Sequence, residues 1–227
     1  MAMAAPWAIP TEMTMTTTMT DADLLRLTQW LSPAFPIGAF AFSHGLEQAI
    51  AAGDVTGAEA LQDWLTDVLS HGAGLADGVL LRAAQSGRGD AAALARALAP
   101  SRERWAETRD QGTAFARTLT AMGVALPEGV ALPVVLGLAA RTLEVAPEQL
   151  IALYLQGFAA NLVSVGVRFM PLGQTAGQLV LAALHPTILA VAGRAATMTP
   201  EDITSAVPGA DLAAMRHETM EVRLFRS

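Results

Sequence analysis

The side chains that could carry out chemistry in this 227-residue chain are few and scattered. Cysteine is absent, which excludes disulfides, thiolate metal sites and cysteine nucleophiles. The histidines lie far apart in the sequence, and none has ligand spacing to a histidine or carboxylate beyond the adjacent pair His217-Glu218. They are His44, His71, His185 and His217. Phosphate-binding glycine loops, nucleophile elbows and paired-carboxylate motifs are also absent. The sequence therefore predicts no enzyme activity, no metal site and no cofactor.

Arg168 stands out because it is the only charged residue between Glu148 and Arg194. Burying an isolated ion costs far more free energy than the net stability of a domain, so Arg168 needs partners or a place at the surface. One alternative is a structural arginine, bound by carbonyl oxygens at a helix end and by nearby glutamines. The other is an arginine that is presented to a partner or ligand. Both alternatives stay open on the sequence alone.

The segment after Arg168 combines a helix break with small and amide side chains. Pro171 ends or kinks the helix that carries Arg168. Gln174 and Gln178 are four positions apart and share a helical face. Gly173 and Gly177 have the same spacing, which lets another backbone come close. We expect one structural or interface motif here, formed by Arg168, Pro171, Leu172, Gly173, Gln174 and Gln178.

A second segment, residues 34–47, places a proline and a glycine ahead of a helix start, which forces an extended loop. Three of the seven phenylalanines of the chain fall within eight positions here, namely Phe35, Phe40 and Phe42. They either pin the loop into the core or form an aromatic anchor for a protein partner. His44 is more typical of a hydrogen-bonded core or interface histidine than of a metal ligand.

The last residues of the sequence place Leu224-Phe225 between Arg223 and Arg226. Terminal segments are usually polar and poorly ordered, and a free tail gains nothing by solvating two large apolar side chains. The tail therefore either folds back as packing or is a peptide that a partner orders. The residues that we expect to bind a partner are Arg223, Leu224, Phe225, Arg226, Phe40, Phe42 and His44.

Composition is typical of a globular helical protein. Hydrophobic residues make up 52% and charged residues 15%, which is too apolar for a disordered chain. Alanine and leucine dominate, which favours helices over strands. All 14 basic residues are arginine and the net charge is -7, so we expect no nucleic-acid-binding surface.

The uncharged segment 169–193 is long enough to cross a membrane. It contains prolines, glutamines and His185, and basic residues are not biased toward one flank, so we expect buried helices and no membrane span. The N-terminus lacks a basic region followed by an apolar one, so no secretory signal is expected. These features favour a cytoplasmic location.

Apolar periodicity predicts an all-α, single-domain bundle of about ten helices. We expect an N-terminal disordered extension at 1–20, a helical domain at 21–215 and a C-terminal tail at 216–227. Thr56 and Glu59 have the spacing of a capping box that begins a helix. The segment 101–122 reads as an ordinary amphipathic helix whose charged side, including Arg104 and Glu107, forms its outer surface. This dense Arg/Glu side either faces solvent or docks onto a partner. Helices are expected over 20–31, 77–84, 91–99, 101–122, 133–143, 148–168, 173–184 and 186–195, with further starts near 57 and 199.

Three stretches together resemble the urease accessory protein UreF family. They read PAFPIGAFAFSHGLE near the start, VGVRFMPLGQTAGQ in the last third and HETMEVRLFRS at the end. Each stretch alone is modestly specific, but their combination and order are characteristic. The resemblance extends from Leu24 to Ser227 and leaves out the N-terminal tract.

The resemblance implies an all-α fold that forms a homodimer and has a non-enzymatic role. Members of the family bind a second accessory protein, UreD (called UreH in some species), and the GTPase UreG. The assembly docks on apo-urease and couples GTP hydrolysis to nickel delivery. The family's tail is ordered against UreD, which corresponds here to Arg223, Leu224, Phe225 and Arg226.

The sequence departs from the family's pattern in one place. The family often has a tyrosine in its first stretch, where this chain has Ala41 and Phe42. An aromatic packing role survives this change, but a hydrogen bond from a hydroxyl does not. An alternative function is a GTPase-activating protein that supplies an arginine finger to UreG, with Arg168 or Arg226 as the candidates.

Overall fold

The computed structural model describes residues 19–204 and 206–227, so the extension predicted at 1–20 lies almost wholly outside the described residues. Within the described ranges the chain is helical and has no strand, which confirms the all-α class. The helices in chain order are α1 (Asp21–Trp30), η1 (Ala39–Ala41), α2 (Leu46–Ala52), α3 (Ala58–His71), α4 (Ala73–Gln85), α5 (Ala91–Ala97), α6 (Arg102–Ala121), α7 (Leu132–Ala140), α8 (Pro147–Phe169), α9 (Gln174–Ala183), α10 (His185–Thr197), η2 (Pro200–Asp202) and α11 (Pro208–His217). The two η elements are single 3-10 turns.

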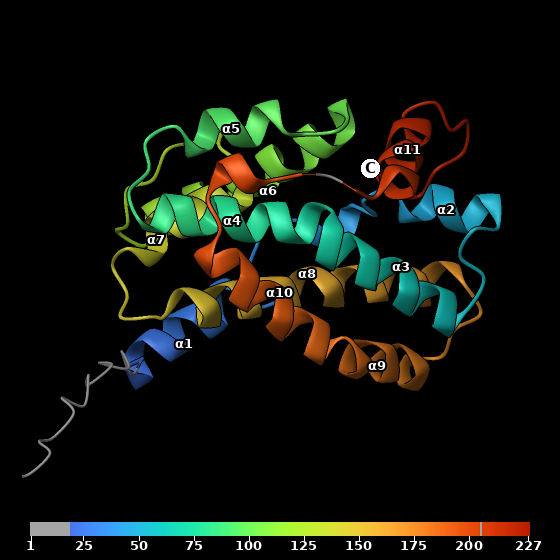
Figure 1. Ribbon diagram of the computed structural model, residues 1–227, viewed down its shortest axis with the longest axis horizontal. Coiled ribbons are helices and arrows are strands. Elements are labelled where there is room, and N and C mark those ends of the chain that lie inside the picture. Colours follow the sequence, from blue (N-terminus) through green and yellow to red (C-terminus); the bar gives the residue numbers. More distant parts are fainter. Residues whose placement is uncertain (1–18, 205) are drawn as a thin grey trace, which may run out of the picture.

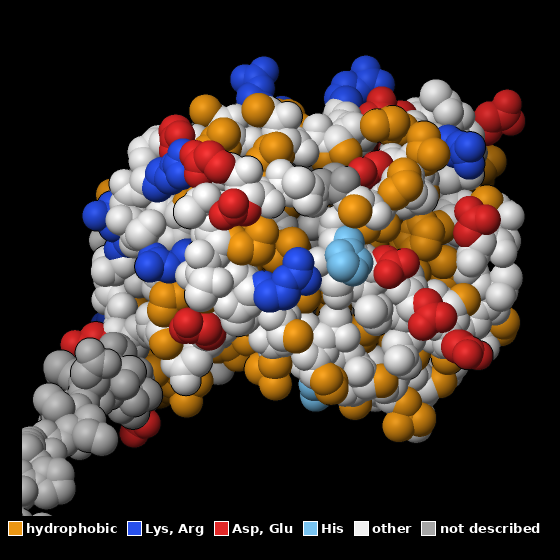
Figure 2. Space-filling model, viewed as in Figure 1, with side chains coloured by type: hydrophobic (Ala, Val, Ile, Leu, Met, Phe, Trp, Pro, Cys, Tyr) orange, Lys and Arg blue, Asp and Glu red, His pale blue; other side chains and the backbone are white. Residues whose placement is uncertain are grey.

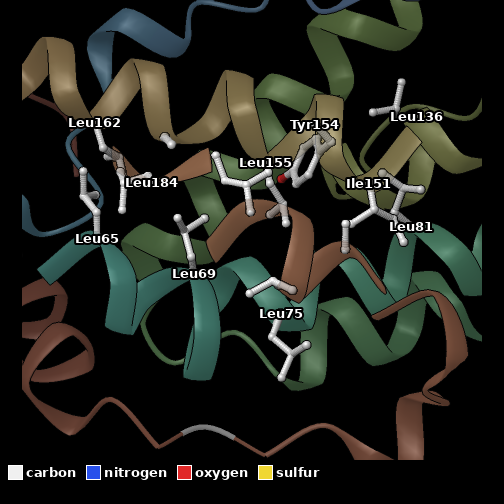
Figure 3. Packing of buried hydrophobic residues seen from close by; sticks show 14 of the residues in the cluster. Leu65, Leu69, Leu75, Leu81, Leu136, Ile151, Tyr154, Leu155, Leu162 and Leu184 are labelled. Atoms are coloured by element: carbon white, nitrogen blue, oxygen red, sulfur yellow. The ribbon is translucent and has the colours of Figure 1, made fainter. Parts of the chain in front are cut away.

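Helix α8 forms the centre of the bundle, as its nearly uniform apolar character predicts. It contacts α2, α3, α4, α9 and α10 (Figure 1). Leucines from α3, α4 and α7 point toward Ile151, Leu155 and Leu162 of α8, and all are buried (Figure 3). Aliphatic side chains therefore fill most of the core, in keeping with the low aromatic content of the sequence.

Helix α8 is also long and apolar enough to cross a membrane by length and composition. Half of its most apolar stretch is buried against the neighbouring helices, which is the usual environment of a core helix. Helices α9 and α10 pass the same test only when they are joined across a bend of 41°. The described residues thus contain one such helix, or two candidates at most.

Glycines allow several helices to come unusually close. A Cβ atom built on Gly137 of α7 would lie 2.4 Å from the carbonyl oxygen of Leu81 in α4. A Cβ atom on Gly177 of α9 would lie 2.6 Å from Cγ2 of Val167 in α8. Both distances are shorter than real Cβ contacts, so these two helix pairs require glycine at the crossing.

The predicted capping box at the start of α3 is wrong. Gly57, with no side-chain cap, is the residue that precedes the helix, so Glu59 lies at the second helical position instead of the third. A capping box does form further along, where Thr199 and Asp202 exchange hydrogen bonds around η2. The difference shows that the motif requires the right starting residue as well as the right spacing.

Candidate functional site

The tail predicted at 216–227 begins two residues later in the structure, because α11 ends at His217. From here on the tail means residues 218–227, which fold back along the molecule. The Arg226 amide donates to the Ala41 carbonyl over 2.8 Å, and the Ser43 amide donates to the Ser227 carbonyl over 2.7 Å. These bonds join the tail to the loop that contains η1, which belongs to the other end of the chain. The structure therefore shows the first of the two alternatives for the tail; whether a partner also binds it stays a prediction.

Three side chains, which we name the anchor cluster, hold the tail: Glu47, Glu103 and His217. Glu47 lies in the first turn of α2 and is only 1% exposed. Its carboxylate accepts the amide hydrogens of Leu224 and Phe225 over 2.7 and 3.0 Å. A charged acceptor makes such bonds stronger than bonds between neutral groups. Glu47 thus fixes the backbone of the tail through a side chain from the other end of the chain.

His217, which is fully buried, joins the two acidic members of the anchor cluster. Its Nε2 lies 3.0 Å from Oε2 of Glu47, and its Nδ1 lies 2.7 Å from Oε2 of Glu103. The other carboxylate oxygen of Glu103 accepts from Arg223 over 2.6 Å. The cluster therefore connects α2, α6, α11 and the tail through one imidazole ring.

Glu218 has a different role from its neighbour His217. Its carboxylate accepts the amides of Arg102 and Glu103, at 2.9 and 3.3 Å, and pairs with the Arg102 guanidinium at 2.9 Å. These amides belong to the start of α6, where unpaired N–H groups and the helix dipole favour a negative charge. The adjacent pair noted in the sequence thus does not act as a unit.

Helix α6 places a second group of polar side chains in the interior, and the prediction that its charged side forms its outer surface is wrong for this group. Arg104, Glu107 and Gln111 are all more than nine-tenths buried. The reason is that α11 and the tail cover this side of α6, which no local pattern in α6 can reveal. Arg104 forms a close ion pair with Glu107, which also accepts a hydrogen bond from Ser227 Oγ at 2.7 Å.

Burial and nearby charges shift the pKa values of Glu107 and His44, which both lie in this buried group. Burial by itself raises the pKa of Glu107, but the Arg104 guanidinium and the His44 contact outweigh it and hold that pKa at about 2. Burial lowers the pKa of His44, and the Arg104 charge lowers it further, which favours a neutral ring. Nδ1 of His44 lies 3.9 Å from Glu107, and the ring packs edge-on against Phe158. His44 therefore lies in the core of this chain, and its predicted role in binding a partner stays a prediction.

The three phenylalanines of the 34–47 loop differ in burial, and an anchoring role of any of them toward a partner stays a prediction. Phe35 and Phe42 are buried, whereas Phe40 is 70% exposed. The Arg226 guanidinium lies 5.0 Å from the centre of the Phe42 ring, and Asn161 donates to the Phe42 carbonyl. Phe42 thus packs against the Arg226 side chain of the tail, and Phe40, whose carbonyl accepts from Arg168, lies at the surface.

Arg168 contacts both the loop and the tail. It donates to the carbonyl oxygens of Ser164 and Phe40 over 3.2 and 3.1 Å. Its guanidinium lies 4.6 Å from the centre of the Phe225 ring, a cation–π contact. The carbonyl partners match the structural alternative, but the residue is exposed, so Arg168 also forms part of the surface.

The rest of the motif that follows Arg168 lies away from the tail. Pro171 and Gly173 are exposed in the turn before α9, and Leu172 is partly buried there. Gln174 and Gln178 are exposed on α9. The structure therefore unites Arg168 with the tail but leaves the two glutamines on a separate surface. An interface role for these residues stays a prediction.

The docked tail has an inner and an outer face. Phe225 and Ser227 are buried, whereas Leu224 is 76% and Val222 81% exposed. Figure 2 shows hydrophobic side chains gathered over the end of the molecule that α2 and α11 form. The outer face, which we define as Phe40, Val222 and Leu224, is the candidate functional site. Within the described residues, no three histidine, aspartate or glutamate side chains are arranged to hold a metal ion.

Sequence reasoning identified the tail but missed Glu47 and Glu103. Glu47 resembles any acidic residue in a first helical turn, and Glu103 resembles a solvated member of the α6 charge pattern. The one indication that Glu47 is buried is its place in the sequence. It directly follows a loop with a buried phenylalanine and a buried histidine, where a solvated charge is unexpected.

Comparisons with known proteins agree with the three stretches noted in the sequence. Residues 55–185 match the UreF family model. The urease accessory protein UreF of Cereibacter sphaeroides strain KD131 is 54% identical over 210 residues, covering 91% of this chain and all of that protein. The UreF of Paracoccus denitrificans is 52% identical over 216 residues, covering 94% of this chain and all of that protein. The chain therefore belongs to the UreF family of urease accessory proteins.

Proposed function

We propose that this protein is a non-enzymatic scaffold in urease maturation, which bridges UreD (UreH) and the GTPase UreG. In this role it regulates the GTP-dependent delivery of nickel into apo-urease, as a homodimer in the cytoplasm. Family membership supports the part in urease maturation. The finer statements rest on the family resemblance and on the surface chemistry of the tail.

The observation that carries the proposal is the outer face of the docked tail. Phe40, Val222 and Leu224 expose large apolar side chains, and Glu47 and the Ala41 carbonyl hold the tail backbone from Leu224 to Arg226. Exposed apolar and aromatic side chains on a fixed backbone are typical of the anchors that dominate protein interfaces. A partner bound here would contact the tail and the loop together. We assign UreD to this face because the family resemblance relates the tail to UreD.

The test is co-purification of UreD and UreG from the same source with full-length variants. Leu224→Asp places a charge on the outer face without changing a buried group, so it should abolish recovery of UreD and leave the melting temperature unchanged. Leu25→Asp, on α1 at 70% exposure, is a matched control and should recover UreD as the unmodified protein does. Equal recovery of UreD by both variants would rule out the outer face as its docking surface.

The arginine-finger alternative is less well supported by the contacts. A finger must be free to enter the active site of another protein. Arg168 already bonds two carbonyl oxygens and the Phe225 ring, and Arg226 pairs with Asp110 and lies over Phe42. Either residue would have to give up its contacts with the tail or loop to act on UreG.

A further inference from the structure

Together with Arg223, the anchor cluster is neutral with both carboxylates ionised only if the His217 ring is positively charged. Glu47 and Glu103 each bring one negative charge, and Arg223 supplies one positive charge to Glu103 alone. With a charged ring the four groups are neutral, and with a neutral ring they carry one net negative charge. A buried, unbalanced charge is costly because the interior cannot solvate it.

Hydrogen-bond geometry leads to the same protonation state. Both ring nitrogens of His217 lie within hydrogen-bond distance of a carboxylate oxygen, at 2.7 and 3.0 Å. An ionised carboxylate only accepts, so each nitrogen must carry a hydrogen to form its bond. A neutral ring has just one such hydrogen, and its other nitrogen would then direct a lone pair at a carboxylate. The observed contacts thus need an imidazolium.

We propose that the anchor cluster is a pH-sensitive latch for the tail, closed while His217 is an imidazolium and opened when the ring loses one proton. Loss of the proton leaves Glu47 and Glu103 to repel each other across the ring. Glu47 holds the amides of Leu224 and Phe225, so any shift of its carboxylate loosens the tail. Deprotonation is favoured as the pH rises, so the latch opens in that direction.

The groups around His217 leave this ring as the element that responds. Glu47 faces it from α2 and Glu103 from α6, while Arg223 faces Glu103 from the tail. Glu218, next in the chain, is paired with Arg102 at the start of α6. Elsewhere on α6, Arg104 pairs with Glu107, and Asp110 pairs with Arg109 and with Arg226 of the tail.

The latch regulates the surface that the proposed function assigns to UreD, and its importance for maturation rests on that proposal. Phe40 belongs to the loop, whereas Val222 and Leu224 belong to the tail, so the outer face exists only while the tail is docked. Opening the latch would remove it. The latch itself can be tested on the isolated chain, so its failure is distinguishable from a failure of UreD binding.

Hydrogen exchange of the full-length protein between about pH 6 and about pH 9 tests the latch, with rates corrected for the intrinsic effect of pH. Protection of the Leu224 and Phe225 amides should fall about ten-fold or more as the pH rises. Protection of Leu155 in the centre of α8 should stay within about two-fold, which excludes global unfolding. Constant protection of the two tail amides over this range would overturn the proposal.

Glu103→Gln is the decisive variant because it removes the need for a second proton on the ring. The side-chain amide that this substitution introduces can donate to Nδ1 of His217 while its oxygen still accepts from Arg223. A neutral ring can then still donate from Nε2 to Glu47. The tail of this variant should stay protected at both ends of the pH range. A variant that loses tail protection with rising pH as the unmodified protein does would assign the effect to another group and sink the latch.

Discussion

The core around α8 and the anchor cluster beneath the tail both lie inside the molecule, yet they are stabilised in different ways. The core consists of aliphatic side chains whose attraction does not depend on direction, so its geometry is set by shape, for example by Gly137 where α7 crosses α4. The anchor cluster consists of charged and polar groups with fixed partners at stated atoms. Substitutions that change side-chain shape should therefore destabilise the core around α8. Substitutions that change charge or protonation should destabilise the anchor cluster.

The largest effect should come from Gly137→Val, which fills the closest approach in the core. Its Cβ would lie 2.4 Å from a backbone oxygen of α4, so the two helices must move apart. We expect a loss of about 3 kcal/mol or more in the free energy of unfolding, measured by urea denaturation. The control is Gly193→Ala in α10, where a Cβ meets nothing within 4 Å. This substitution should raise the free energy of unfolding by about 0.5 kcal/mol, because alanine favours the helix more than glycine does. Similar stabilities for the two variants would contradict the view that shape limits the core.

Glu47→Ala should disrupt the anchor cluster and leave the core around α8 intact. It removes the acceptor of two tail amides and one of the two carboxylates beside His217. We expect loss of hydrogen-exchange protection at Leu224 and Phe225, unchanged helical circular dichroism, and a cost of about 3 kcal/mol. Glu59→Ala is the matched control, since Glu59 also lies in a first helical turn but is exposed. Retained tail protection in Glu47→Ala would mean that the backbone bonds to the loop suffice.

Asp77 tests what a partly buried carboxyl costs at the edge of the core. Its carboxylate accepts from Tyr154 Oη at 2.6 Å, and burial raises its pKa to about 6. The folded pKa lies above the ordinary value of 3.8, so this group's contribution to stability is fully present below about pH 4 and is lost as the pH rises through about 6. Asp77→Asn keeps the tyrosine bond and should be more stable by about 1–3 kcal/mol at pH 8, with no difference at pH 4. The test is the free energy of unfolding of the unmodified protein and of Asp77→Asn, measured between pH 4 and pH 8. A constant difference between the two proteins would show that ionising Asp77 costs little.

The smallest effect should come from Arg168→Ala, which removes an exposed cation–π contact to the tail. Such contacts contribute about 0.5–1 kcal/mol, so protection of the Phe225 amide should fall about two- to five-fold. Arg168→Lys keeps the charge and should recover part of this loss. Measuring UreG turnover with Arg168→Ala also addresses the arginine-finger alternative, because turnover equal to that with the unmodified protein would exclude Arg168 as the finger.

The same contrast explains which features the sequence could predict. The stripe of Leu61, Leu65 and Val68 predicts α3 and its buried side, because the information lies within two helical turns. Most of the expected helices were confirmed, with ends shifted by a few residues. The start expected near 199 gives only the η2 turn, α2 was expected only as a helix start, and α11 was not among the expected helices. Helix periodicity is a local property, and the packed core follows from it.

The anchor cluster could not be predicted in this way. Glu47 and His217 are 170 positions apart, and each matches an ordinary local pattern, a first-turn acid and a last-turn base. Likewise, Arg104 and Glu107 belong to a helix whose charges look solvated until α11 and the tail cover them. Phe40 and Phe42 could be noticed as a pair, but their opposite exposures depend on the docked tail.

The long separation between Glu47 and its partners has a consequence for the order of folding. Helices α3 to α10 lie between them in the chain, and their contacts can form before residues 217–225 leave the ribosome. Until then Glu47 has none of its partners in α11 and the tail and stays hydrated. Closure of the tail is thus a late event in synthesis, and the outer face cannot form before helices α3 to α10 have been made.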